Sequence, residues 1–103
     1  MLRNKAIILN SSDNVATALT DLAQGEVIIA QLGDLRYETT LREDIPFGHK
    51  FALRDIPRGS PVLKYGLPIG NALADIPAGA WVHVHNCRSR RFGFQRKHYG
   101  LKA

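Results

Sequence analysis

With 103 residues, 45% of them hydrophobic and 22% charged, the chain is expected to form one small globular domain that is too small to enclose a deep active site by itself. Its net charge of +5 is unevenly distributed, because residues 1–86 hold eight Lys/Arg and nine Asp/Glu whereas residues 87–103 hold six Lys/Arg and no acid. No apolar run reaches the roughly 18 residues of a membrane helix, and the single Cys87 excludes an internal disulfide, so we expect a cytoplasmic protein without membrane contact.

The first half of the chain predicts short strands and one helix. Residues 5–10 read as a buried strand. Residues 11–14 offer helix-capping side chains, and apolar residues then recur at helical spacing up to the stop signal Gly25: Val15, Ala18, Leu19 and Leu22. This pattern predicts the one substantial helix of the protein. Residues 26–42 predict two further strands that are joined by a turn at Gly33.

The second half repeats a short turn motif. The sequence D-I-P-x-G starts at Asp44, Asp55 and Asp75, and an apolar-rich segment follows each copy. Proline sets φ at the second position of a β-turn and glycine relaxes the fourth, so each copy predicts a tight corner between strands. The sequence therefore predicts a mostly-β fold with one short helix, compact and barrel-like or clip-like.

Two histidines close the last apolar segment, W-V-H-V-H-N. In an extended strand, His83 and His85 would share one face with Trp81, and Val82 and Val84 would point to the core. Two neutral imidazoles at this spacing can reach one metal ion, although a catalytic site usually needs three or more ligands. The alternative is an exposed or hydrogen-bonded pair on an edge strand.

Other candidate residues lie after the first D-I-P-x-G turn and in the loop at 64–70, K-Y-G-L-P-I-G. His49 suits a third ligand or an acid/base group. Lys50 and Lys64 suit carboxylate binding, and the alternative for both is a solvated surface cation. The glycine-rich loop either presents N–H groups to an anion or is simply a corner of the fold.

The tail at residues 87–103 interleaves basic and aromatic side chains, among them Phe92, Phe94 and Tyr99. Such a pattern binds nucleic acid through phosphates and stacking, or forms a solvated or partner-docking segment. The rest of the chain is nearly neutral and offers no basic face next to the tail that could enlarge a nucleic-acid-binding surface. This argues against nucleic-acid binding.

Three motifs in a fixed order resemble a known family: G-H-K at 48–50, K-Y-G-L-P-I-G at 64–70 and H-V-H-N at 83–86. They are similar to the small N-terminal domain of altronate and galactarate dehydratases, a SAF-type domain with a β-clip fold. The same domain occurs as a free-standing small subunit, for example in sulfolactate sulfo-lyase. The resemblance implies a SAF-like β-clip domain over residues 1–86 and a basic C-terminal tail over residues 87–103.

The resemblance also implies a role in dehydration, or a related β-elimination, of a sugar acid or hydroxy acid. It implies a divalent metal, typically iron(II), that is held jointly with a large catalytic subunit, and little activity of this chain alone. The matched residues are then expected to be catalytic (His49, Lys50 and Lys64), substrate-binding (Tyr65 and Asn86) and metal-ligating (His83 and His85).

Alternatives stay open at this point. The leaving group is either water, as in altronate dehydratase, or sulfite, as in sulfolactate sulfo-lyase. A non-catalytic module that binds sugar acids or serves assembly is a further reading, as is nucleic-acid binding through the tail. An unpaired sheet edge would also allow a homo-oligomer.

Overall fold

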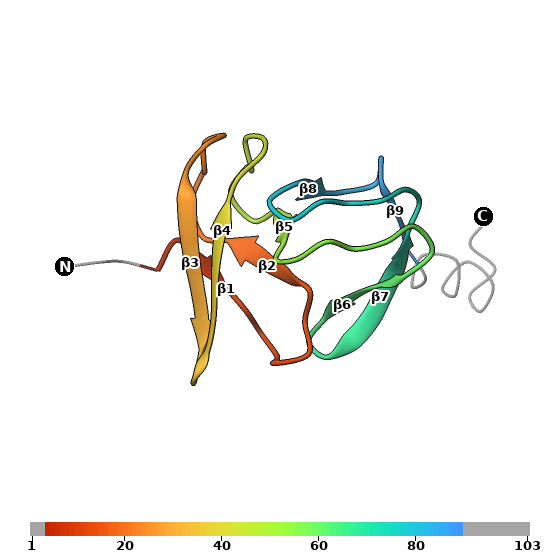
Figure 1. The fold of residues 1–103 in the computed structure, drawn as a ribbon, viewed down its shortest axis with the longest axis horizontal. Helices are drawn as coiled ribbons and strands as arrows, with labels where there is room; N and C mark the ends of the chain where they lie inside the picture. Colours follow the sequence, from red (N-terminus) through yellow and green to blue (C-terminus); the bar gives the residue numbers. More distant parts are fainter. Residues whose placement is uncertain (1–3, 90–103) are drawn as a thin grey trace.

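The structure, a computed structural model, describes residues 4–89 and contains strands, turns and loops over that range (Figure 1). Its nine strands are β1 (Ala6–Ile7), β2 (Val15–Ala18), β3 (Val27–Leu32), β4 (Leu35–Thr40), β5 (Lys50–Ala52), β6 (Pro61–Lys64), β7 (Leu67–Ala72), β8 (Trp81–Val82) and β9 (Cys87–Ser89). Within these described residues, no helix has the length and apolar character needed to cross a membrane. The prediction of a small, mostly-β domain is confirmed.

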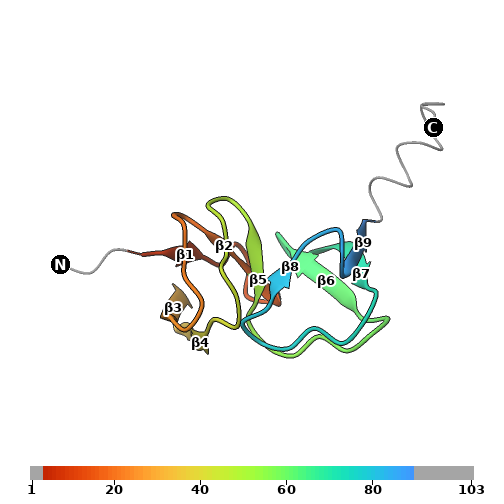
Figure 2. The same ribbon diagram turned by 90° about the horizontal axis from the view of Figure 1, so that it is seen from above.

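The strands form three antiparallel sheets. A central sheet has the order β1-β2-β5-β8, and the β3–β4 hairpin lies on one side of it. A sheet of order β6-β7-β9 lies on the other side, as the two perpendicular views in Figure 1 and Figure 2 show. The β3–β4 hairpin pairs continuously from Val27 opposite Thr40 to Leu32 opposite Leu35, which confirms the two strands predicted around Gly33.

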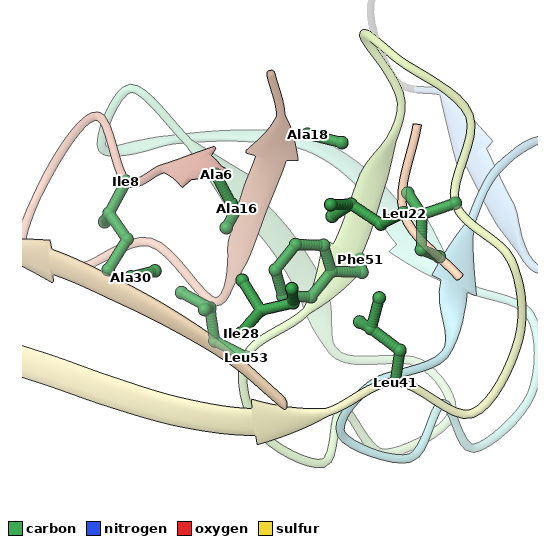
Figure 3. Close-up of a cluster of buried hydrophobic side chains, with 11 residues drawn as sticks. Ala6, Ile8, Ala16, Ala18, Leu22, Ile28, Ala30, Leu41, Phe51 and Leu53 are labelled. Carbon is green, nitrogen blue, oxygen red and sulfur yellow. The ribbon is translucent and has the colours of Figure 1, made fainter. Parts of the chain in front are cut away.

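Two apolar cores lie on opposite faces of the central sheet, because neighbouring residues of a strand point to opposite sides. In β5, Phe51 belongs to one core and Ala52 to the other, and Val15 and Ala16 divide in the same way in β2. The core around the fully buried Phe51 is shown in Figure 3. Both strands are therefore buried on both faces and lack the polar–apolar alternation of a half-exposed strand.

The predicted helix after residue 14 is wrong, because this segment begins with strand β2. β2 pairs with β1 on one side and with β5 on the other, where Val15 lies opposite Ala52. The expected capping residues serve another purpose: Asn14 donates its amide to the Pro61 carbonyl and accepts from the Leu63 N–H. The apolar residues at helical spacing belong here to a strand that is buried on both faces. Over so few residues, the spacing of apolar residues does not distinguish such a strand from a helix.

Four tight turns rather than three organise the fold. The segment D-L-A-Q-G at residues 21–25 folds like the three D-I-P-x-G segments, although it lacks their proline. The four turns associate as two pairs, 21–25 with 44–48 and 55–59 with 75–79, which we call the paired turns. An isolated β-bridge joins the second residues of each pair, Leu22 with Ile45 and Ile56 with Ile76.

Reciprocal hydrogen bonds connect the members of each pair. The aspartate that opens one turn accepts from the N–H of the fourth residue of the other turn, at 2.8–2.9 Å in all four cases: Asp21 from Phe47, Asp44 from Gln24, Asp55 from Ala78 and Asp75 from Arg58. The closing glycine of each turn has φ between +83° and +90°, a conformation that side chains with a Cβ rarely adopt. The repeated aspartates and glycines are thus scaffold residues.

Strand β9 adds to the predicted domain. Cys87–Ser89, which the sequence assigns to the basic tail, pairs with β7 through Ala72, Asn71 and Gly70. The folded part therefore continues to Ser89, three residues past the predicted boundary at Asn86. The rest of the predicted tail, with its basic and aromatic residues, lies outside the described residues.

Candidate functional site

The pairing of β5 with β8 brings the histidines together. Lys50 lies opposite Val82 and Phe51 opposite Trp81, so the residues just before β5 and just after β8 meet at one end of the strand pair. His49 immediately follows the turn at 44–48, and His83 immediately follows β8. The sequence positions that were predicted to share a site, around residues 49 and 83, are thus adjacent in space.

Four aromatic rings form a contiguous group, which we call the ring cluster: His49, Trp81, His83 and His85. The Trp81 indole is central, because it stacks on His83 with ring centroids 5.1 Å apart and an interplanar angle of 6°. It also contacts His49 and His85, each at a centroid distance of 5.5 Å. His49 and His83 are 5.0 Å apart. Trp81 was not among the predicted site residues, although its place on the same strand face as the histidines was a usable signal.

The segment after β8 is a turn and not a continuing strand. The His83 carbonyl accepts from the N–H groups of Asn86 and Cys87, at 3.0 and 2.9 Å, which bends the chain back toward β9. Val84 was expected in the core but lies at the tip of this turn with 75% of its surface exposed. Period-two alternation failed here because the strand ends at Val82, so the later residues follow turn geometry.

Asn86 holds this turn through both ends of its side chain. Its amide donates to the Trp81 carbonyl at 2.8 Å, and its Oδ1 accepts from the His83 N–H at 3.0 Å. The structure therefore places Asn86 beside the ring cluster as a residue that orients the backbone of two cluster members.

Lys50 adjoins the ring cluster at His83, and Lys64 and the Cys87 thiol lie near Lys50. Partial burial lowers the pKa of Lys50, and the nearby positive charge of Lys64 lowers it further. Burial also raises the pKa of the Cys87 thiol, against a smaller opposing effect of Lys50. The described residues contain two ion pairs, Lys5 with Glu26 and Arg36 with Glu38, so neither Lys50 nor Lys64 has a carboxylate partner within that range.

Burial and nearby positive charge act on His83 as well. Partial burial is the main factor that lowers its pKa, and His49, Lys50 and His85 add to the effect. The neutral imidazole, which is the form that binds metal ions, is therefore favoured. However, no group of three or more His, Cys, Asp or Glu side chains could hold a metal ion anywhere between residues 4 and 89. A metal at this site would need further ligands from outside the described residues.

The sequence left open whether the glycine-rich loop at 64–70 binds an anion or is simply a corner of the fold, and the structure shows both features. Tyr65 and Gly66 have φ of +59° and +74°, so together they form the tight turn between β6 and β7. Their N–H groups donate to the carboxylate of the fully buried Asp13, at 3.1 and 2.8 Å. The anion that these N–H groups bind is therefore an internal side chain, which the sequence pattern did not identify.

Tyr65 itself is exposed, with 62% of its surface accessible. The Lys64 Nζ lies 5.4 Å from the centre of the tyrosine ring, so the two side chains form a cation–π pair. Within the described residues, Tyr65 has no ring contact with the histidines. Of the seven predicted site residues, His49, His83, His85, Lys50 and Asn86 thus gather around Trp81, whereas Tyr65 lies apart and Lys64 connects the two regions.

Comparison with known proteins adds direct evidence on the family. A model of the altronate/galactarate dehydratase SAF domain matches residues 4–90. Altronate dehydratase of Escherichia coli (strain K12) is 53% identical over 83 residues, which are 81% of this chain and 16% of that protein. Altronate dehydratase of Bacillus subtilis (strain 168) is 37% identical over 93 residues, or 90% of this chain and 18% of that protein.

A second kind of relative is a separate small subunit. The alpha subunit of (2R)-sulfolactate sulfo-lyase from Paracoccus pantotrophus is 41% identical over 56 residues, which are 54% of this chain and 84% of that subunit. The chain thus spans less than a fifth of the length of the two altronate dehydratases but most of the length of the sulfo-lyase subunit. The family match covers every described strand, the ring cluster and both lysines, and the chain belongs to the altronate/galactarate dehydratase SAF domain family.

Proposed function

We propose that the chain works as the small subunit or N-terminal domain of a sugar-acid or hydroxy-acid dehydratase of the altronate dehydratase type, together with a large catalytic partner. The observation that carries this proposal is the ring cluster next to Lys50 and its neighbour Lys64, which have no carboxylate partner among residues 4–89, in a chain 53% identical to the corresponding part of an altronate dehydratase. The small share of that dehydratase which the chain covers supports the need for a partner. We expect the complex to be cytoplasmic.

The two lysines suit the substrate of such a reaction. Elimination next to a carboxylate needs positive charge that stabilises the enolate-like intermediate, a base for the α-proton and an acid for the leaving group. We expect Lys50 and Lys64 to bind the carboxylate, because their charges repel each other until an anion arrives. The partial burial of Lys50 makes this attraction stronger than it would be in bulk water.

The ring cluster would supply polar groups at the other end of the substrate. We expect His49 to hydrogen-bond a substrate oxygen and Asn86 to keep Trp81 and His83 in place through its two hydrogen bonds. Tyr65, which exposes its ring beside Lys64, would contact a more distant part of the sugar acid.

A divalent metal, iron(II) in our proposal, would be shared with the partner. His83 and His85 would provide two imidazole nitrogens, and the described residues offer no third ligand beside them. When bound, the metal would supply Lewis-acid stabilisation of negative charge on the substrate. The residues of this chain would bind and orient the acid next to it.

Reconstitution tests the proposal. The chain is mixed with its candidate large subunit and iron(II), and dehydration of altronate is measured for the parent chain and for the His83→Ala, His85→Ala double variant. We expect at least a hundredfold loss of turnover in the double variant. The control Ser60→Ala changes the position after the third turn, whose backbone hydrogen-bonds to Pro57 and Ala72, and should keep parental turnover. Unchanged turnover in the double variant would contradict the assigned role of the histidines.

The sulfo-lyase relative supports a second candidate, in which the leaving group is sulfite. The match covers 84% of that alpha subunit, so a chain made up mostly of this domain can serve as one subunit of a lyase. The same reconstituted complex is supplied with sulfolactate, and released sulfite is measured. Sulfite release without altronate dehydration would favour this second candidate.

A further inference from the structure

Trp81 is held more firmly than its position near the surface suggests. Its backbone N–H donates to Glu43 Oε2 at 2.9 Å, and its carbonyl accepts from the Asn86 amide at 2.8 Å. One side of the indole packs against the core around Phe51. The ring is therefore fixed by the fold before any ligand binds.

The indole N–H of Trp81 donates to Nδ1 of His49 at 3.2 Å. An indole nitrogen can only donate, so His49 Nδ1 must be the acceptor and carries no proton. In neutral imidazole, the single N–H then resides on Nε2. This contact selects one of the two tautomers of His49.

We propose that Trp81 is a positioning residue that fixes His49 as an Nε2–H hydrogen-bond donor. Nδ1 is occupied by the indole and Nε2 carries the proton, so neither nitrogen of this neutral imidazole offers a lone pair to a metal ion or to an α-proton. The inference deepens the proposed function: His49 donates to an oxygen of the bound acid and is neither a third metal ligand nor the general base. The sequence had left those roles open.

The role of the ring must be separated from that of the N–H group. Trp81 also stacks on His83 at an interplanar angle of 6°, and this contact needs only an aromatic surface. Trp81→Phe keeps an aromatic ring at this place and removes the donor. The variant therefore changes the hydrogen bond to His49 with the smallest change in packing.

Nuclear magnetic resonance on the uniformly ¹⁵N-labelled full chain tests the proposal. Trp81 is the single tryptophan of the sequence, so its indole resonance needs no further assignment. At about pH 8, where histidines are mostly neutral, we expect a scalar coupling across the hydrogen bond between indole Nε1 and His49 Nδ1. We also expect a His49 Nε2 shift typical of a protonated nitrogen. Absence of the coupling, or a protonated Nδ1, would overturn the proposal.

The reconstituted enzyme provides a second, independent readout. We expect kcat of Trp81→Phe to fall roughly tenfold, as for the loss of one aligned hydrogen bond, while its unfolding midpoint stays near that of the parent. Parental kcat in Trp81→Phe would remove the positioning role even if the coupling is observed. If the parent complex lacks lyase activity, the proposed function fails, and the coupling alone still decides whether Trp81 fixes the tautomer.

Discussion

The paired turns and the ring cluster use polar groups in opposite ways. In the paired turns, each of the four aspartates receives a backbone N–H from the partner turn. Around the ring cluster, two lysines lie close together without a carboxylate partner in the described residues, and burial lowers the pKa of Lys50 and of His83.

This difference separates stability from function within one small domain. Donors and acceptors that are already paired inside the protein are not free to bind a ligand. The paired turns are therefore suited to hold the two cores together. Charges that are partly desolvated and unpaired cost stability and are retained at sites where a ligand supplies the missing partner. Substitutions in the two regions should therefore have opposite effects on the free energy of unfolding.

The largest loss of stability is expected for Gly79→Ala, in the last of the four turns. A Cβ at this position would lie 2.2 Å from the Thr40 carbonyl oxygen, with φ at +87°. Overlap with backbone and the left-handed conformation together should lower the free energy of unfolding by roughly 3–5 kcal/mol.

Gly59→Ala is the matched control for this prediction. Gly59 has a similar φ of +85°, but nothing lies within 4 Å of its added Cβ. Its loss should be only about 1–2 kcal/mol. Urea unfolding of both variants measures the difference, and equal losses would show that the contact between Gly79 and Thr40 does not matter.

A smaller loss is expected when an aspartate of the paired turns is removed. Asp44→Ala and Asp75→Ala each delete one charged acceptor from a backbone N–H, at 2.8 and 2.9 Å. Each should cost about 1–2 kcal/mol in urea unfolding, and the two losses should be similar because the two bonds are equivalent. Asp34→Ala, in the exposed β3–β4 turn, should be neutral. A loss confined to one pair would contradict the equivalence of the pairs.

A gain of stability is expected for Lys50→Met in the isolated chain. The substitution keeps the apolar stem and removes a charge that is partly buried and repelled by Lys64. We expect the free energy of unfolding to rise by less than about 1 kcal/mol. Lys5→Met, which deletes an exposed ion pair with Glu26, should produce no gain. A clear loss in Lys50→Met would mean that the lysine already stabilises the free chain.

The smallest expected effect is the loss of the stability that Glu26 contributes when the pH is lowered. A hydrogen bond from Lys5 and another from the Ala23 N–H hold the pKa of Glu26 below its ordinary value near 4.5. A glutamate with a lowered pKa in the folded state contributes stability above that ordinary value, and the contribution is lost as the pH falls through the lowered one. Unfolding midpoints of the parent and Glu26→Gln should therefore converge on acidification from pH 4.5, and a constant difference would contradict this linkage.

Part of the candidate site was predictable from short motifs. G-H-K and H-V-H-N identified His49, Lys50, His83 and His85 as one group, and pairing of β5 with β8 places them together. The sequence placed Trp81 on the same strand face as the histidines but gave it no role in the site, because the pattern does not show what an indole N–H would contact. The role of Trp81 depends on which imidazole meets its N–H, and that partner is 32 residues away in sequence.

The early helix shows the limit of periodicity. The segment after Asn14 has apolar residues at helical spacing, but its neighbours in space are β1 and β5. A strand with one pairing partner on each side and a core on each face can accept almost any apolar pattern. Only contacts with residues that are distant in the chain could therefore decide between helix and strand.

The amino-acid sequence by itself determined three of the four paired turns, because proline and glycine restrict or free φ at their own positions whatever surrounds them. It also determined the family, through three short motifs in order. The tertiary structure alone decided which turn pairs with which, where the Asp13 carboxylate goes, and that one indole gathers three imidazoles. Those outcomes depend on contacts between distant segments, whose geometry follows from packing two cores against one shared sheet.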